Sequence, residues 1–198
     1  MIKKQKDNEE DVELAAKLHG HFSAGVALGV RMGQIGLKRL GLSRGDKRLF
    51  AVVETSLCLA DGIQASTGCT PGHASLHIVD FGKLAVCLAR SDTKIGFRIA
   101  LKRDVQSPLV EGWMMRKAKL NHEMEEELAK ELLRLDESFF TIEEVRIEPF
   151  YEYDNSEIVQ CSRCKELLTG SKAVKREEEI LCKACSGLRY YMVRHTPS

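Results

Sequence analysis

The stretch HGHFSAGVALGVRMGQIGLKRLG, residues 19–41, determines how the first half of the chain is organised. Small and apolar residues recur there at helical spacing, from Ser23, a residue type that caps helices, to a final glycine typical of a helix end. Gly25, Gly29 and Gly33 are four residues apart and share one face of this helix. Because a glycine inside a helix costs about 1 kcal/mol relative to alanine, we expect a strand or another helix to pack very close to this face.

The rest of the first 150 residues alternates between helical and extended patterns, which predicts an α+β domain. The expected helices are 7–20, 56–66 and 118–134, and the expected strands are 49–54, 74–80, 83–90, 95–103 and 143–150. The three middle strands are joined by connections short enough for hairpins, so we expect them to form a meander. Cys87 lies in the middle of one of these strands and is expected in the core.

Length and composition indicate a globular protein with one main domain and one small domain. Of the 198 residues, 43% are hydrophobic, which is enough for a core domain over residues 1–150 with an appended domain over residues 151–198. The longest apolar run is far shorter than the ~20 residues of a membrane span, and the N-terminus is acidic where a signal peptide is apolar. The clustered cysteines favour a reducing compartment. We therefore expect a cytoplasmic protein with no membrane partner.

The cysteines near the C-terminus give the most specific signal in the sequence. Cys161 and Cys164 form one Cys-x-x-Cys pair, and Cys182 and Cys185 form a second pair after a gap of 17 residues. This spacing is typical of a zinc ion bound by four thiolates. Four sulfur ligands leave the ion no open position. We therefore expect a structural zinc finger, in which metal binding supplies roughly 10 kcal/mol or more of folding free energy.

The balance of charge argues against nucleic-acid binding. Residues 1–150 carry 22 basic and 22 acidic side chains, and residues 151–198 carry 8 basic and 7 acidic ones. Four thiolates on one Zn²⁺ make the small domain more negative, which weakens its attraction to phosphate. A protein contact or a stabilising role is thus the expected function of the finger. The finger and the apolar stripe of the 118–134 helix both indicate a homodimer.

The histidines His19 and His21 leave two interpretations open. On a regular helix their side chains point apart, whereas in an extended or capping segment, which Gly20 permits, both can face one side. Together with Cys58 they would then form a three-ligand zinc site, with water or substrate in the fourth position. In the structural interpretation, His19 caps a helix end, Cys58 is a small buried hydrophobe and Asp61 is a surface acid.

Three motifs, in order, carry a resemblance to a known family. HGHFSAGVALGVRMG, ETSLCLADGIQASTGCTPGHASL and DFGKLAVCLA resemble the E-subunit family of formylmethanofuran dehydrogenase over most of residues 13–105. The resemblance implies a thioredoxin-like α+β core with a mixed β-sheet flanked by helices. It also implies that the zinc finger behind this core is treble-clef-like.

The resemblance further implies a metal-binding active site formed by His19, His21 and Cys58, with Asp61 and Cys69 in or beside it. The family commonly reads His-Gly-His-x-Cys-Pro-Gly, whereas Ser23 and Ala24 occupy the Cys-Pro positions here. A hydroxyl thus replaces a thiol, which argues against dithiol chemistry and leaves the two histidines and Cys58 as the ligand set. His73, in an altered loop, is a further candidate ligand or neighbour of the site.

The leading hypothesis from this resemblance is a zinc-binding accessory protein of one-carbon metabolism. It would assist the molybdenum or tungsten enzyme that fixes CO2 onto methanofuran in methanogenesis, with the other subunits of that enzyme as partners. One zinc is expected in the finger and a second in the core. The alternatives are an independent zinc enzyme, with Asp61 as base and Lys83 as a partner for substrate charge, and a nucleic-acid-binding regulator that uses the finger.

Overall fold

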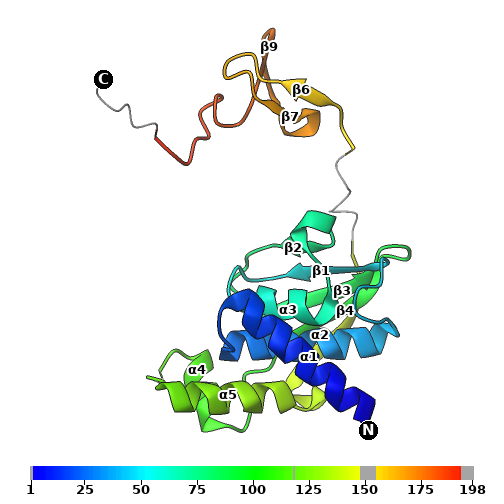
Figure 1. Ribbon diagram of the computed structural model, residues 1–198, viewed down its shortest axis with the longest axis vertical. Helices are drawn as coiled ribbons and strands as arrows, with labels where there is room; N and C mark the ends of the chain where they lie inside the picture. The colour runs from blue at the N-terminus through cyan, green and yellow to red at the C-terminus, as the bar shows by residue number, and fades with distance from the viewer. Residues whose placement is uncertain (1, 118, 148–154, 193–198) are drawn as a thin grey trace. The chain divides into compact units, whose positions relative to one another are not determined.

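The computed structural model describes residues 2–117, 119–147 and 155–192 (Figure 1). The chain divides into two compact units, Met1–Tyr151 and Glu152–Ser198. The first unit is an α+β domain with a mixed sheet, as the sequence predicts, and the second contains the four clustered cysteines. Within the described ranges, no helix has the length and apolar character needed to cross a membrane.

Three helices of the first unit pack together (Figure 1): α1 (Ile2–His19), α2 (Ala24–Leu40) and α3 (Leu59–Thr67). The predicted caps of α2 are confirmed. Ser23 Oγ accepts a hydrogen bond from the backbone N–H of Val26 at 3.5 Å. Gly41 ends the helix in the left-handed conformation, with a φ of 63°. The first helix, α1, begins before the residue 7 expected from the sequence.

Glycines on α2 and α3 bring the two helix backbones into direct contact. A Cβ atom at Gly29 would lie 2.3 Å from the carbonyl oxygen of Leu59, and one at Gly62 would lie 2.2 Å from that of Val26. The close approach predicted for the glycine face of α2 is therefore confirmed, and its partner is the helix α3. This contact holds Cys58, the residue before α3, beside the start of α2.

Five strands form the sheet, in the order β2-β1-β3-β4-β5. They are β1 (Leu49–Val53), β2 (Leu76–Ile78), β3 (Ala85–Arg90), β4 (Ile95–Leu101) and β5 (Phe140–Arg146). β2 is parallel to β1, and the other neighbouring pairs are antiparallel. The predicted meander is wrong at its first step, because β2 pairs with β1 and not with β3. The helix α3 between β1 and β2 is the kind of crossover that parallel neighbours need.

The central strand β3 lies at the middle of the core. Its first five residues are all buried, among them Cys87 at 8% exposure, which confirms the core position predicted for this cysteine. Burial, reinforced by the charge of Glu54, raises the pKa of the Cys87 thiol to about 12. This thiol therefore stays protonated and packs as a small hydrophobe.

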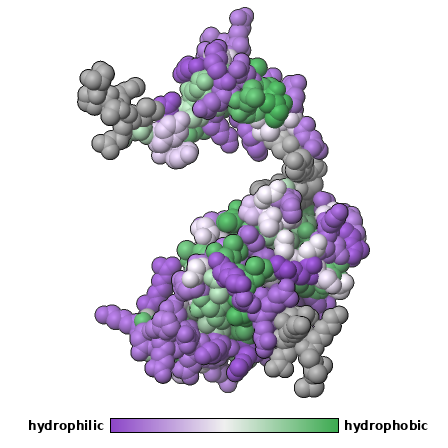
Figure 2. Space-filling view, viewed as in Figure 1, coloured by the Kyte–Doolittle hydropathy of each residue, from purple (hydrophilic) through white to green (hydrophobic). Residues whose placement is uncertain are grey.

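Two helices after β4 complete the first unit. α4 (Pro108–Met114) was not predicted, because seven residues are too few for a clear helical period. α5 (His122–Arg134) begins later than expected, where Asn121 Oδ1 accepts a hydrogen bond from Met124 N–H at 2.9 Å. Leu128 and Leu132 are fully buried, α5 packs against α2, and hydrophilic side chains gather over α4 and α5 (Figure 2). Residues 118 and 148–150 of the expected elements lie outside the described residues.

The second unit consists of two short hairpins. The first pairs β6 (Ile158–Gln160) with β7 (Leu167–Thr169), and the second pairs β8 (Val174–Arg176) with β9 (Glu179–Leu181). Short 3-10 turns occur in both units, at Pro71–His73, Glu137–Phe139 and Gly170–Lys172. Each hairpin leads into or out of one Cys-x-x-Cys pair, so the strands position the cysteines.

Candidate functional site

The four cysteines of the second unit form a compact cluster. One Sγ atom from each of Cys161, Cys164, Cys182 and Cys185 lies within 4.8 Å of all the others. In the described part of the chain, this is the one group of three or more His, Cys, Asp or Glu side chains placed to hold a metal ion. The predicted four-cysteine metal-binding site is therefore confirmed. Zinc, as the identity of its metal, stays a prediction.

Backbone N–H groups donate hydrogen bonds to two of the sulfur atoms in this cluster. Donation from Cys164 N–H, and then from Cys182 N–H, lowers the pKa of Cys161 to about 6. The Cys182 nitrogen is 3.3 Å from Cys161 Sγ, and the Cys185 nitrogen is 3.3 Å from Cys182 Sγ. A thiolate is the form that binds a metal. Four sulfur ligands would close the coordination shell of a bound metal ion and would leave no position for a substrate.

The two histidines come together at the end of α1. His19 is the last residue of this helix, and Gly20 has a φ of 94°, which turns the chain out of the helix. The centroids of the His19 and His21 rings are 4.9 Å apart. His19 Nδ1 is 2.7 Å from Oδ2 of Asp61 in α3. This hydrogen bond fixes the orientation of the His19 ring through one of its two nitrogens.

Cys58 is connected to this pair through α3, whose Asp61 contacts His19. It immediately precedes α3, it is half-buried, and it is one helical turn from Asp61. Its Cβ atom is 3.0 Å from the position that a Cβ at Gly25 would take. The side chains of His19, His21 and Cys58, as they lie, do not form a metal-binding cluster of the kind the four cysteines form. Metal ligation by these three residues stays a prediction.

Two residues that the resemblance placed near the site lie at the opposite end of α3. Cys69 follows the C-terminus of this helix, so nine helical residues separate it from Cys58, or roughly 13 Å at the usual rise. The Cys69 thiol is buried, 3.8 Å from the carbonyl oxygen of Leu49, and burial raises its pKa. His73 is exposed in the 3-10 turn that follows. The helix itself therefore excludes both residues from the Cys58 region.

A partly buried ion pair holds the base of the loop that carries Cys58. Glu54 follows β1 and is 7% exposed, and its two carboxylate oxygens accept hydrogen bonds from Arg98 of β4 at 2.6 and 2.9 Å. Its carbonyl oxygen accepts hydrogen bonds from the N–H groups of Phe81 and Lys83. Sequence reasoning missed this pair, because no local pattern links residues 44 positions apart.

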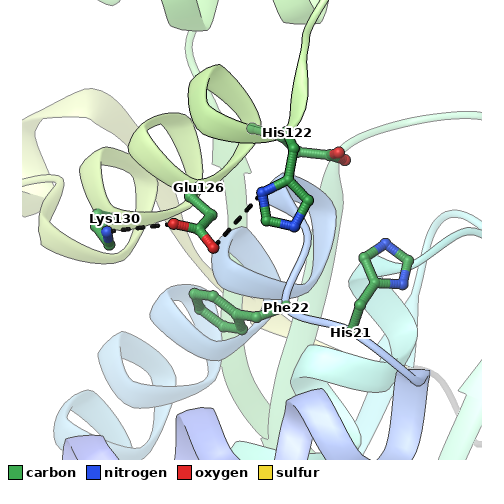
Figure 3. Close-up of a pocket in the computed structure, with 6 residues that line it drawn as sticks. His21, Phe22, His122, Glu126 and Lys130 are labelled. Carbon is green, nitrogen blue, oxygen red and sulfur yellow. Dashed lines mark ion pairs between the residues drawn. The ribbon is translucent and has the colours of Figure 1, made fainter.

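A cavity of about 520 Å³ opens beside His21 (Figure 3). Figure 3 shows His21 and Phe22, from the segment between α1 and α2, opposite charged side chains of α5. There, Glu126 lies 3.7 Å from both the His122 ring and the Lys130 ammonium. The apolar stripe predicted for this helix implies a polar opposite face, but it could not show that this face borders the histidines.

Two smaller cavities lie next to the segment that contains Leu57 and Cys58. One, of about 170 Å³, is lined by Cys58 and by Glu125, which also lines the cavity at His21. The other, of about 400 Å³, extends to Arg116. These two cavities share Leu57, Leu84 and Trp113, and together we call them the Trp113 cleft. No sequence pattern predicts the cleft, because its walls come from separate segments of the chain.

The molecule thus combines an α+β domain, which carries paired imidazoles and a thiol beside a cleft, with a four-cysteine metal-binding unit. Residues 18–149 match the family described as "FmdE, Molybdenum formylmethanofuran dehydrogenase operon". The chain belongs to the FmdE family, as its motifs predicted.

Two relatives show how far this likeness extends. The crystal structure of an FmdE-like protein of the tungsten formylmethanofuran dehydrogenase type, from Syntrophus aciditrophicus, is 28% identical, with a TM-score of 0.74, and the match covers 93% of this chain and 95% of that chain. A "Probable S-adenosyl-L-methionine-binding protein" from Archaeoglobus fulgidus is 31% identical over 90% of this chain. The chain spans about half the length of this curated relative, 53%.

Proposed function

We propose that the chain is a zinc-binding accessory protein of one-carbon metabolism that assists a formylmethanofuran dehydrogenase. Its core site consists of His19, His21 and Cys58, and a second zinc is held by the finger. Membership of the FmdE family supports the link to that enzyme, whose other subunits are the proposed partners. The observation that carries the core site is the hydrogen bond from His19 Nδ1 to Asp61, within one helical turn of Cys58.

The donor set fits zinc chemically. Two imidazole nitrogens and one thiolate are ligands that zinc prefers, and three protein ligands leave a fourth position open. A zinc ion bound there would act as a Lewis acid. Asp61 is then a positioning residue, because its carboxylate is engaged in orienting His19. The role of base considered for Asp61 from the sequence stays a prediction of the zinc-enzyme alternative.

Counting metals per chain tests the core site. Elemental analysis of the purified protein should give two zinc ions per chain, one for each site. Cys58→Ser should reduce the count to one, as should Cys161→Ser by emptying the finger. Cys87→Ala, which removes a thiol from the core strand, should leave two. A count of one in the unchanged protein that Cys58→Ser does not alter would refute the core site.

The role of Asp61 can be tested separately by affinity. Asp61→Asn should weaken zinc binding at the core site by about 10- to 100-fold, the usual effect of losing a carboxylate that orients a ligating histidine. Competition with a chromophoric chelator measures this in the Cys161→Ser background, where the finger does not contribute. Asp104→Asn, an exposed carboxylate outside the site, is the matched control.

An independent zinc enzyme is a second candidate function. The observation that favours it is the cavity lined by Cys58, which would give a substrate access to the open position of a bound metal. In the Cys161→Ser variant loaded with Co²⁺, an exchangeable position predicts that azide shifts the visible absorption bands. Bands that do not change with azide would mean a closed metal site and would rule this function out.

A further inference from the structure

The walls of the Trp113 cleft are apolar and open to solvent. Leu57 is 55% exposed, while Leu84 and Trp113 are half-buried, and all three line both cavities of the cleft. Large apolar side chains left accessible in a concave site are the usual wall of a small-molecule site. An indole ring adds a flat face that packs well against an aromatic or branched body.

At one end of the cleft, Arg116 occupies a backbone position that favours glycine. Lys117 N–H donates to Gly112 at 2.8 Å and Arg116 N–H donates to Trp113 at 3.0 Å, the hydrogen-bond pattern that closes a helix with a left-handed residue. Arg116 is that residue, with a φ of 53°. A residue with a side chain is strained there by about 1 kcal/mol relative to glycine. Glycine would therefore be more stable at this position than arginine. Backbone conformation at the end of α4 does not explain why an arginine is present.

The guanidinium of Arg116 is available to a ligand. Among the described residues, no carboxylate forms an ion pair with it, although the side chain lines the larger cavity. A guanidinium presents a planar fork of donors that matches a carboxylate. Arg116 therefore favours a ligand with an anionic group at this end of the cleft.

The opposite end of the cleft carries the opposite charge. Glu125 of α5 is half-buried there, in the cavity that Cys58 also lines. A carboxylate next to an apolar wall repels a second negative charge. A ligand with one anionic end fits this arrangement, and a ligand with anionic groups at both ends does not.

We propose that the Trp113 cleft binds a small organic acid, with its apolar body against Trp113, Leu57 and Leu84 and its single carboxylate on Arg116. The ligand lies with its far end beside Cys58 and Glu125. This site is additional to the proposed metal sites, and binding does not require a metal at Cys58.

The fluorescence of Trp113 reports directly on this site, because it is the single tryptophan of the chain. Three probes of similar shape separate the attraction of Arg116 for one carboxylate from the repulsion of a second carboxylate by Glu125. They are 3-phenylpropionate, its neutral amide, and 3-(4-carboxyphenyl)propionate, which carries a second carboxylate. In titrations of the full chain, 3-phenylpropionate should change the emission saturably. The amide and the dicarboxylate should each bind about fivefold more weakly, the scale of one partly exposed charge contact.

Two substitutions then assign the charges. Arg116→Gly relieves the left-handed strain, so this variant should be at least as stable as the unchanged protein, yet it should lose the preference for the acid over the amide. Glu125→Gln should restore binding of the dicarboxylate to the level of 3-phenylpropionate. Arg134→Gln, which changes an exposed arginine of α5 outside the cleft, should leave all three affinities unchanged.

Several outcomes would overturn the proposal. No saturable emission change with 3-phenylpropionate, or equal affinity for the acid and the amide, would show that the cleft does not select an organic acid. Loss of acid binding in Cys58→Ser together with full retention in Arg116→Gly would show that the carboxylate binds a metal at Cys58 instead. This last result would contradict the cleft proposal while supporting the core metal site.

Discussion

Among single residues, Gly29 and Gly62 decide whether the core site can exist. Each glycine removes a Cβ atom from the place where α2 and α3 touch. The contact sets the distance between the start of α2, which follows the histidine pair, and the start of α3, which follows Cys58. The lack of side chains at these two positions thus sets how close the histidine pair and Cys58 can come to each other.

Gly29→Ala should therefore destabilise the first unit by about 3 kcal/mol, because the new methyl group would overlap a backbone carbonyl that cannot move independently. Urea unfolding followed by Trp113 fluorescence measures the change. Gly72→Ala is the matched control, since a Cβ atom there meets no atom within 4 Å. Similar stabilities of the two variants would mean that α2 and α3 can separate at little cost.

The buried thiol of Cys87 makes the stability of the first unit depend on pH in the alkaline range. Its pKa is about 12 in the folded chain against an ordinary value of 9.0, so above pH 9 the unfolded chain loses this proton while the folded chain keeps it. The thiol's contribution to stability is fully present below pH 9 and falls as the pH rises towards 12.

The stability difference between the unchanged protein and Cys87→Ala should consequently shrink by about 1 kcal/mol between pH 9 and pH 10. Urea unfolding of both proteins at each pH measures it, and the comparison cancels the lysines and tyrosines that titrate in the same range. Two parallel curves of stability against pH would contradict the assignment of a protonated, buried Cys87.

Among the secondary-structure elements, α5 serves two purposes with its two faces. Its buried leucines, Leu128 and Leu132, close the core against α2. Its charged side, with Glu125 and Glu126, borders both the histidine cavity and the Trp113 cleft. The same amphipathic helix therefore packs against the core and contributes acidic side chains to the lining of both cavities.

Leu128→Ala should cost about 3 kcal/mol, because it removes a fully buried side chain and leaves a cavity under α5. Glu127→Ala, at the neighbouring exposed position, should change stability by less than about 0.5 kcal/mol. Thermal or urea unfolding of the two variants gives the comparison. A small effect of Leu128→Ala would indicate that α5 is not part of the cooperative core.

Across the full chain, the two compact units obtain their stability from different sources. The first unit has an extensive apolar core shared by its helices and sheet. The second has two hairpins built from three-residue strands, and Cys161 and Leu181 are the buried residues in its described part, so little apolar core surrounds its cysteine cluster. Its metal would therefore be part of its folding free energy. Homodimer formation stays a prediction that light scattering can test.

Removing the metal from the finger should consequently unfold the second unit alone. Cys161→Ser should abolish amide protection over residues 155–192 in hydrogen exchange, while the urea midpoint reported by Trp113 in the first unit stays unchanged. Cys69→Ala, which changes a buried cysteine of the first unit, should lower the urea midpoint reported by Trp113 and leave the amide protection of residues 155–192 unchanged. A shift of the Trp113 midpoint in Cys161→Ser would show that the two units fold together.

Features that depend on local spacing could be predicted from the amino-acid order alone. These are the caps and glycine face of α2, the core position of Cys87, the mixed α+β class and the four cysteines, because helix periods, caps and Cys-x-x-Cys turns involve residues close together in the chain. The motifs also identified the family correctly.

Which distant residues meet could be learned only from the folded chain. In the folded chain β2 pairs with β1, His19 contacts Asp61, and Glu54 pairs with Arg98. Cys69 and His73 lie at the far end of α3 from Cys58. The Trp113 cleft has Arg116 and Glu125 at its ends. The physical reason is that packing of apolar surfaces is not directional along the chain. A sequence pattern shows that a face will be buried, but the position of a side chain against a remote neighbour depends on how all the elements pack at once.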